Sequence, residues 1–386
     1  MPYRIAILLP RFSKYGGVEQ FGYRLASELA TRGHLVDFIC SRKETEPPEG
    51  VRVLEGSRPV GMQVLKMWLF LRHAEKYRQL GDYDCVVGLG KTLHQDVLRV
   101  GGGSIRELWK HTEKGFPSGP GSLWKKIRRR MAPSNWLTMW IEKQQYSGDC
   151  PIVANSHFIR DVIMAEHPVL QTKSIDIIYN RPDLSQFAPP SAQEREKARA
   201  TLGIIPDCTA VGFATSSFPR KGTEPLVRSF SLLPKQFHLY VAGGRGHKHY
   251  DALARQLGIG DRVHFLGRVD TMPLFYKALD VFALPSFFDA CSNTVVEALA
   301  TGLPAVSSST NGSSYFLPPE WVVSDPNNIA ELAEAIQKAS LSERGKVFDW
   351  PEDIRAGMDT FIDYVESVAI KKRLARASQD GMKNPA

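Results

Sequence analysis

Cysteine is scarce in this sequence of 386 residues. The cysteines are odd in number and form no Cys-x-x-Cys pair: Cys40, Cys85, Cys150, Cys208 and Cys291. A disulfide framework needs paired cysteines and a zinc site needs closely spaced ones, so neither is indicated. Few, scattered cysteines are typical of a reducing compartment, and we expect a cytosolic location.

Long apolar runs are also missing. VLKMWLFL, at residues 64–71, is far shorter than the roughly 20 apolar residues that span a bilayer as a helix. The first residues, MPYRIAILLPRF, show no basic segment, apolar segment and cleavage site in that order. They therefore predict a first strand rather than a signal peptide.

The first half of the chain lacks the acidic residues that would balance its basic ones. Residues 1–175 hold 26 Lys and Arg against 17 Asp and Glu, a balance of +9, whereas the remaining residues balance to −1. A basic half of this kind favours an anionic partner, which could be nucleic acid, an anionic lipid surface or an acidic substrate.

The loop after the first strand lacks the Gly-x-Gly-x-x-Gly pattern of dinucleotide-binding enzymes. PRFSKYGG offers only Gly16 and Gly17, directly before a predicted helix. This counts against a dehydrogenase. The two glycines still let the backbone approach a phosphate or a sugar closely.

Short apolar strands alternate with helical patterns along most of the chain. YRIAILLP, a helical stretch through FGYRLASELATRG, and HLVDFIC form a first β-α-β unit, and a second series of strands follows in the second half. Such alternation is typical of parallel sheets covered by helices on both faces. The sequence therefore predicts an α/β protein with two doubly wound, Rossmann-like domains.

The domain boundary is expected in IYNRPDLSQFAPPSAQ, at residues 178–193, because its Pro, Asn and Ser disfavour regular structure. A last helix is predicted in DIRAGMDTFIDYVESVAIKKR, and the polar tail after it resembles disordered sequence. The sequence predicts an N-terminal domain over residues 1–178 and a C-terminal domain over residues 179–345. A C-terminal helix over residues 346–372 is expected to pack back on the first domain, and a disordered tail is expected over residues 373–386.

Two acids, Asp289 and Glu297, stand eight positions apart in DACSNTVVEALATGLPAV. A strand precedes them, and TVVEALATG predicts a helix that Ser292 or Asn293 caps and Gly302 ends. Both acids can then face the carboxyl ends of the strands, where open α/β sheets bind ligands. The first-turn N–H groups, which suit a phosphate or sugar hydroxyls, belong to Asn293, Thr294 and Val295. The alternative is an ordinary capped helix with one exposed acid.

Further polar candidates follow two other predicted strands. Arg220 and Lys221, with Gly222 behind them, follow CTAVGFATS, and two cations at such a turn can neutralise a diphosphate leaving group. A solvated basic turn is the alternative. In the first half, His94 and Asp96 are the best acid–base candidates, although His94 fits a surface or packing role equally well.

Taken together, these stretches resemble a known family. DACSNTVVEALATGLPAV is similar to the Glu-x7-Glu signature of the retaining family-4 glycosyltransferases, which have the GT-B fold. PRFSKYGGVEQFGYRLASELATRGHLVDF resembles the family's opening glycine loop, and FATSSFPRKGTEPLVRSF resembles its phosphate-binding loop. YVAGGRG, RVHFLGRV and MPLFYKALDVFALPS follow in the family's order. The ordered set is specific, whereas any one motif alone is weak.

The resemblance implies two domains facing a central cleft, with a nucleotide-sugar in the second domain. It implies that Glu297 meets the ribose and that Asp289, one methylene shorter than the family's usual Glu, meets the donor sugar. Arg220 and Lys221 would hold the diphosphate. The remaining donor-binding residues that it implies are Gly16, Gly17, Gly267, Arg268, Val269, Ser292, Asn293, Thr294 and Val295.

The adjacent Arg-Lys pair resembles the bacterial lipopolysaccharide-core glucosyltransferase branch, where a carboxylate in a similar Asp-Val context maps onto Asp96. The implied activity is retaining transfer of a hexose from UDP-glucose to a lipopolysaccharide-core or other cell-envelope glycan. Asp96, Arg220, Lys221 and Asp289 are the implied catalytic residues. The alternatives are a GT-B nucleotide-sugar epimerase and a membrane-associated, non-catalytic module of the same fold.

Two short sequence motifs resemble metal-binding motifs. Asp82-Tyr83-Asp84 matches the Asp-x-Asp motif of the other large glycosyltransferase fold, but it precedes a strand, at the wrong end for a ligand. His247-Lys248-His249 has no partner cluster in the sequence. The resemblance implies neither a metal nor another cofactor, because cations and helix N-termini stabilise the phosphates in GT-B enzymes.

Residues 123–140, LWKKIRRRMAPSNWLTMW, interleave five cations with Trp124, Trp136 and Trp140. This composition is typical of a segment at an anionic membrane surface. Nucleic acid is the rival partner, but no RNA- or DNA-binding module accompanies the segment. A solvated helix is the third possibility. We expect a peripheral protein at the inner face of the cytoplasmic membrane, with no nucleic-acid partner.

Overall fold

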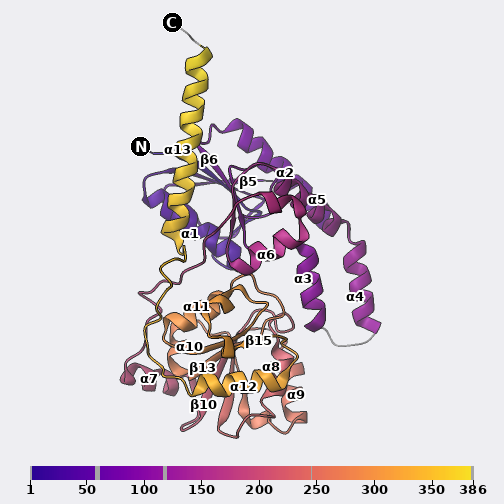
Figure 1. Cartoon of the computed structure of the whole chain (residues 1–386), viewed down its shortest axis with the longest axis vertical. Coiled ribbons are helices and arrows are strands. Elements are labelled where there is room, and N and C mark those ends of the chain that lie inside the picture. Colours follow the sequence, from indigo (N-terminus) through magenta and orange to yellow (C-terminus); the bar gives the residue numbers. More distant parts are fainter. Residues whose placement is uncertain (1, 57–60, 116–119, 245, 384–386) are drawn as a thin grey trace. The chain divides into compact units, whose positions relative to one another are not determined.

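The computed structural model describes residues 2–56, 61–115, 120–244 and 246–383 (Figure 1). The chain forms two compact units, of which the first comprises residues 1–105, 123–180 and 355–386 and the second comprises residues 106–122 and 181–354. Each unit is a parallel sheet with helices packed against it. The predicted α/β class with two doubly wound domains is therefore confirmed.

The first unit is built on a seven-stranded sheet with the order β5-β3-β1-β6-β7-β8-β9. Its central strands are short, apolar and almost entirely buried, because helices cover both faces of a parallel sheet. The strands are β1 (Arg4–Leu8), β3 (Leu35–Cys40), β5 (Val51–Glu55), β6 (Cys85–Gly88), β7 (Val97–Val100), β8 (Ile152–Ala154) and β9 (Ile175–Ile177), with a separate pair formed by β2 (Arg11–Phe12) and β4 (Arg42–Lys43).

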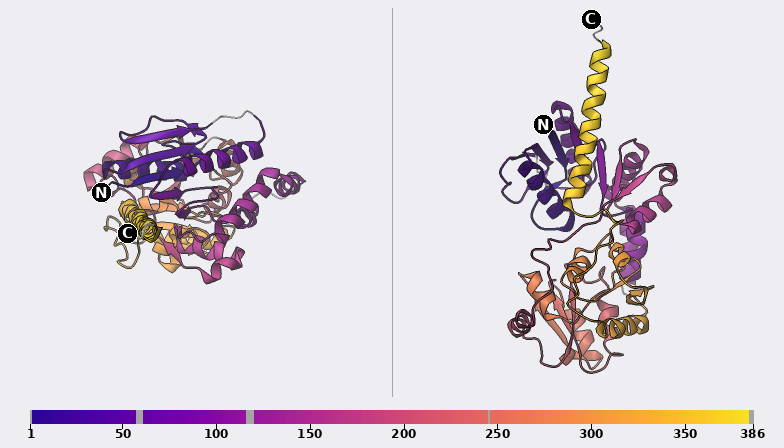
Figure 2. Two further views of the ribbon diagram at one scale, coloured as in Figure 1. Left: turned by 90° about the horizontal axis from the view of Figure 1, so that it is seen from above. Right: turned by 60° about the vertical axis from the view of Figure 1, so that its left-hand side comes forward.

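The helices that belong to the first unit pack apolar faces against this sheet. In α1 the buried residues Gly22, Leu25, Ala26 and Leu29 recur at helical spacing. The last helix joins the same core through Phe361, Ile362, Val365 and Ala369, and its final turns extend past the sheet (Figure 2). The helices are α1 (Gly17–Thr31), α2 (Gln63–Leu80), α4 (Pro120–Met131), α5 (Pro133–Ser147), α6 (His157–Glu166), η2 (Pro168–Thr172) and α13 (Met358–Lys383).

The second unit has a six-stranded parallel sheet with the order β12-β11-β10-β13-β14-β15. Its strands are β10 (Thr209–Ala214), β11 (Phe237–Ala242), β12 (Val263–Gly267), β13 (Val281–Leu284), β14 (Ala305–Ser308) and β15 (Val322–Val323). Its helices are α3 (Ile105–Thr112), η1 (Glu113–Gly115), α7 (Ala192–Leu202), α8 (Thr223–Ser229), α9 (Lys248–Gln256), η3 (Gly260–Arg262), α10 (Met272–Ala278), α11 (Asn293–Ala300), η4 (Gly312–Phe316), η5 (Pro319–Trp321) and α12 (Ile329–Ser340).

Both sheets reverse their strand order at one place. In the first unit β1 pairs with β3 on one side and with β6 on the other. In the second unit β10 pairs with β11 on one side and with β13 on the other. Successive connections diverge at such a switch point, so the loops at its carboxyl end leave room for a ligand. Each unit therefore has one favoured binding edge.

The division of the chain differs from the predicted parts in three ways. The boundary between the units lies at Asn180 and Arg181, and the chain returns to the first unit at Arg355. Residues 106–122, which were expected in the N-terminal domain, group with the second unit. Helix α13 starts at Met358 and continues to Lys383, through most of the region predicted as a disordered tail. Of that region, residues 384–386 lie outside the described residues. Within the described residues, no helix is both long and apolar enough to cross a membrane.

Asp37 in β3 is the centre of a buried polar cluster. Its carboxylate accepts hydrogen bonds from Arg52 at 2.6 Å and from the Tyr83 hydroxyl at 2.7 Å, and it lies 3.3 Å from Arg4. Burial opposes ionisation, but the hydrogen bonds from Arg52 and Tyr83 outweigh it and hold the pKa of Asp37 below its ordinary value.

We predict that Asp37→Asn lowers the free energy of unfolding by about 1.5–3 kcal/mol at pH 7, because hydrogen bonds to a charged partner are lost. The folded-state pKa of Asp37 is lower than the unfolded-state pKa of roughly 3.9, so the ionised carboxylate stabilises the folded protein above that unfolded-state value. This stabilisation is lost as the pH falls through the folded-state pKa. Urea denaturation should therefore show a smaller difference below pH ~4 than at pH 7. Asp149→Asn, at an exposed site, is the control. Equal stability of Asp37→Asn and wild type at pH 7 would contradict this account.

Candidate functional site

The candidate site lies at the switch point of the second unit. The loop Thr215–Gly222 follows β10, and the loop Pro285–Ser292 follows the neighbouring strand β13. A backbone hydrogen bond ties the loops together, since the Phe287 N–H donates to the Arg220 carbonyl at 3.0 Å. The two loops that carry the predicted cations and the first predicted acid are therefore in contact.

Gly222 allows this close approach. Its φ of 74° lies in the left-handed region, and a Cβ there would collide with the Pro285 carbonyl oxygen. Any other residue would meet both a backbone penalty and a clash. Glycine is therefore required sterically after Arg220 and Lys221, because it lets α8 begin in contact with the loop that follows β13.

Lys221 and Asp289 form an ion pair between the two loops, with both side chains only 12% exposed. The backbone of Asp289 is fixed on both sides, because its N–H donates to Thr310 O at 3.0 Å and its carbonyl accepts from Gly312 N at 2.9 Å. Burial lowers the pKa of Lys221, and the charge of Asp289 opposes that shift. In the free protein Asp289 neutralises Lys221.

Arg220 is the second cation of the site. Its side chain is partly exposed, and among the described residues it has no ion pair or hydrogen bond. Its carbonyl, in contrast, is held by Phe287. The backbone is therefore fixed while the guanidinium remains available to an anion.

Helix α11 brings the remaining predicted donor residues to the same edge. The Ser292 N–H donates to Asn311 Oδ1 at 3.3 Å, and the Ser292 and Thr294 hydroxyls lie 2.9 Å apart. The helix begins at Asn293, so the N–H groups of its first turn, including those of Thr294 and Val295, point toward the edge where the loops meet. This arrangement suits an anion.

Glu297 lies one turn into α11 and is partly buried. Its carboxylate accepts a hydrogen bond of 2.9 Å from Tyr276, a buried residue of α10. Burial raises the pKa of Glu297, and the bond from Tyr276 partly opposes this shift. Tyr276 lies in MPLFYKALDVFALPS, but nothing in that stretch predicts its hydrogen bond with Glu297.

The other predicted donor residues lie farther along the sheets. Gly267 ends β12, which is two strands from β10, and Arg268 and Val269 follow it at the same edge. Exposed Arg268 pairs with Asp270 at 2.8 Å. Gly16 and Gly17 belong to the first unit, where Gly16, with a φ of 99°, precedes α1 at that unit's own switch point.

Asp96 does not lie at a ligand-binding edge. It directly precedes β7, at the amino end of the sheet, and its carboxylate accepts from Val86 N at 2.8 Å and from Lys372 of α13 at 2.6 Å. The predicted catalytic role of Asp96 is therefore not supported, because its charge holds α13 to the sheet. His94 is exposed and contacts Glu75 at 3.0 Å.

The two metal-like patterns have structural roles. Asp82 pairs with Arg376 at 2.7 Å, and Asp84 pairs with Arg373 at 2.6 Å, so both acids anchor α13. His247 stacks on Phe265 with ring centroids 5.1 Å apart. Among the described residues, no group of three or more His, Cys, Asp or Glu side chains could hold a metal ion.

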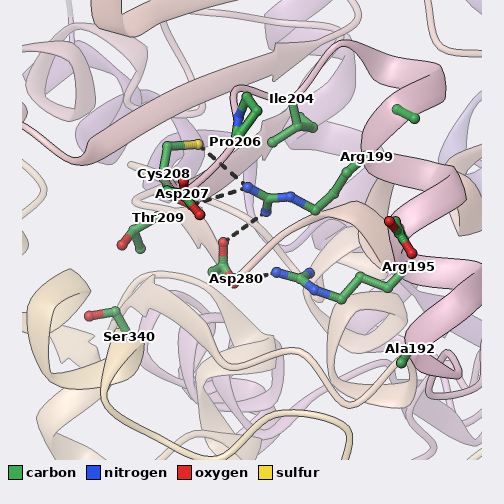
Figure 3. A pocket seen from close by; sticks show the side chains of 12 residues that line it. Ala192, Arg195, Arg199, Ile204, Pro206, Asp207, Cys208, Thr209, Asp280 and Ser340 are labelled. Carbon is green, nitrogen blue, oxygen red and sulfur yellow. Dashed lines mark hydrogen bonds and ion pairs between the residues drawn. The ribbon is translucent and has the colours of Figure 1, made fainter.

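A cavity of about 730 Å³ lies at the opposite, amino end of the second sheet (Figure 3). Asp280 lies in its wall and pairs there with Arg195 at 2.8 Å and with Arg199 at 3.2 Å, and Arg344 binds the same carboxylate at 3.1 Å. These arginines also donate to the carbonyls of Ala278 and Leu279 at the end of α10. Their hydrogen bonds are used within the fold, so this cavity is not the favoured site.

The chain is similar to known glycosyltransferases over most of its length. A family model described as "Glycosyltransferase Family 4" matches residues 15–186, and one described as "Glycosyl transferases group 1" matches residues 206–340. The lipopolysaccharide glucosyltransferase WaaG of Escherichia coli K12 is 25% identical over 380 residues, which cover 92% of this chain and 94% of the relative.

Two solved structures show the same fold. The structure of WaaG, a glycosyltransferase involved in lipopolysaccharide biosynthesis, matches with a TM-score of 0.73 and 18% identity over 96% of this chain and 95% of that one. HepE from Anabaena, in complex with UDP and glucose, matches with a TM-score of 0.61 and 16% identity over 97% and 100%. At these identities the structures establish the fold alone.

The buried acid of α11 leads to a stability prediction. Because the folded-state pKa of Glu297 is raised, the folded protein loses stability as the pH rises from the unfolded pKa, roughly 4.3, toward the folded value. We expect Glu297→Gln to stabilise the free protein by about 0.5–2 kcal/mol at pH 7 and to have less effect below pH ~4. Chemical denaturation at both pH values, with exposed Glu352→Gln as the control, measures this. A loss of stability at pH 7 would show that the carboxylate is a structural group.

Proposed function

The chain belongs to the family-4 glycosyltransferases with the GT-B fold, and from this premise we propose that it transfers glucose from UDP-glucose to a lipopolysaccharide-core or other cell-envelope glycan. The observation that carries the proposal is the group at the second switch point: an available Arg220 beside the Lys221–Asp289 pair and the start of α11. The E. coli relative, named as a lipopolysaccharide glucosyltransferase, supports the choice of sugar and acceptor.

In the proposed donor complex, cations and backbone N–H groups hold the diphosphate. Arg220 and the first turn of α11 meet its oxygens, and Lys221 supplies further positive charge. Glu297 accepts hydrogen bonds from the ribose hydroxyls, and Asp289 lies near the sugar. Arg220, Lys221 and the N–H groups of α11 would supply the charge stabilisation that a metal ion provides in other enzymes. The proposed reaction therefore needs no metal and no further cofactor.

We propose that the acceptor binds at the first unit, and that Gly16 and Gly17 keep their predicted role toward the donor. We propose retention of configuration at the transferred carbon. The acceptor hydroxyl would attack from the face that the diphosphate leaves, and a diphosphate oxygen would take its proton. This route agrees with the position of Asp96, which is engaged by Lys372 and is not needed as a base.

We predict that Lys221→Met lowers kcat by about 10²–10³-fold, because the cation acts mainly on charge that develops as the sugar–phosphate bond breaks. Uridine, which has no phosphate, should bind with unchanged affinity. Steady-state kinetics with UDP-glucose and calorimetry with uridine test this. Lys235→Met, an exposed lysine of the same unit, is the matched control. Equal losses in kcat and in uridine affinity would indicate a disturbed fold instead.

Residues 123–140 support a membrane-surface role for the first unit. Trp124 and Trp136 are each 63% exposed, and Met131 is 72% exposed. Burial together with the nearby Arg129 and Arg128 lowers the pKa of Lys125, so like charges are crowded on α4. An anionic bilayer would relieve this repulsion and cover the tryptophans. We propose that the enzyme works at the inner face of the cytoplasmic membrane.

We predict that replacing the five cations of α4 with Gln releases the protein from anionic vesicles, since each cation near such a surface contributes about 1 kcal/mol. Sedimentation with anionic and neutral vesicles at low and high salt measures the effect, and activity on a soluble acceptor fragment should survive. A control variant makes the same change at five exposed cations of the second unit: Lys197, Lys235, Arg255, Lys338 and Lys346. If wild type does not sediment with anionic vesicles at low salt, the segment is not a membrane anchor.

A further inference from the structure

The segment Arg106–Gly115 groups with the second unit although it lies within the first half of the sequence. It contains most of α3 and all of η1, and it follows directly on Gly101–Ile105 of the first unit. Two of its residues, His111 and Gly115, lie against the loops of the candidate site. The segment is therefore a separate element that the chain adds to the donor unit.

Gly115 lies where the two loops meet. A Cβ on Gly115 would come within 2.5 Å of two ring carbons of Phe287 and within 2.9 Å of the Pro219 carbonyl oxygen. Phe287 belongs to the loop after β13, and Pro219 belongs to the loop after β10. No side chain fits at Gly115 unless one of these loops moves, because a backbone oxygen cannot turn aside as a flexible side chain can.

The neighbours of Gly115 adjoin the proposed catalytic groups. Pro219 directly precedes Arg220, and the Phe287 N–H is the donor in the bond to the Arg220 carbonyl. Phe287 and Phe288 are each 2% exposed and directly precede Asp289. A shift of either phenylalanine or of Pro219 would therefore change the distance between the cations and Asp289.

His111 provides a second contact from the same segment. Its ring lies 5.8 Å from the ring of Phe288 and tilts by 38° from it. Burial lowers the pKa of His111, which favours the neutral ring. A neutral imidazole packs beside an aromatic ring without bringing a buried charge to the site. His111 and Gly115 thus touch consecutive phenylalanines of one loop.

We propose that Arg106–Gly115 is a positioning segment for catalysis, in which Gly115 and His111 hold Phe287 and Phe288 and so fix Arg220 and Lys221 relative to Asp289. The proposal rests on the proposed function, because that function assigns the donor diphosphate to Arg220 and Lys221 and the donor sugar to Asp289. The segment touches none of the reacting atoms. It acts by keeping charged groups in place before the substrate arrives, which is the condition for efficient electrostatic catalysis.

The experiment adds side-chain volume at Gly115 alone. Gly115→Val should lower turnover of UDP-glucose on the order of 100-fold, since a displacement of about 1 Å in a catalytic group can have that effect. Gly115→Ala should show a smaller decrease in kcat. Uridine affinity should stay at the wild-type value in both variants, because Glu297 and its helix are not displaced. Gly121→Ala is the matched control, since a Cβ there meets nothing within 4 Å.

Two further measurements separate positioning from general damage. Phe287→Leu removes the ring carbons that the new Cβ would strike, so Gly115→Ala combined with Phe287→Leu should regain part of the kcat that Gly115→Ala loses. Hydrogen exchange of Gly115→Val should be faster in residues 216–222 and 286–291 and unchanged in β10 and β13. If Gly115→Val does not fold, the kcat of Gly115→Ala with and without Phe287→Leu decides the test.

The outcomes distinguish this inference from the function on which it rests. A wild-type protein that neither binds UDP nor releases it from UDP-glucose would contradict the proposed function. A wild-type protein that turns over UDP-glucose, with Gly115→Ala and Gly115→Val equally fast, would overturn the positioning role alone. Parallel losses of kcat, uridine affinity and melting temperature in Gly115→Ala would also overturn it, because they would indicate a purely structural glycine.

Discussion

The hydrogen bond from the Phe287 N–H to the Arg220 carbonyl, 3.0 Å long, joins two loops that lie more than sixty residues apart in the sequence. It can form because β10 and β13 are neighbours at the point where the sheet reverses its strand order. Gly222 makes the approach possible, and the Lys221–Asp289 pair closes beside it. The proposed donor site depends on this one constraint, since each of its cations is placed by a loop that the bond holds.

The charges of the site are arranged for a ligand that brings negative charge of its own. Asp289 neutralises Lys221 in the free protein, whereas Arg220 remains available. Glu297 is kept in a setting that disfavours its charged form. A partly buried acid with a raised pKa, and a cation without an ion pair in the described part of the chain, do not help the free protein to fold. Both are better explained by binding than by stability.

The positions of the site residues could be predicted from the sequence better than the bounds of the two units. Arg220, Asp289 and α11 could be predicted to share an edge because each directly follows a recognisable strand, and parallel strands end at the same edge. Asp96 was misplaced because the motif did not show that its strand begins only at Val97, which puts the acid at the amino end. The contacts of Gly115, Tyr276 and α13 are long-range, and no local pattern encodes them.

The proposed function requires that the carboxyl edge of the second sheet binds a nucleotide-sugar. Hydrogen exchange with and without UDP-glucose measures this most directly, because it reports each loop separately. We expect slower exchange in the loops Thr215–Gly222 and Pro285–Ser292 and in the first turn of α11. Protection confined to the cavity around Asp280, or no protection in the second unit at saturating UDP-glucose, would contradict it.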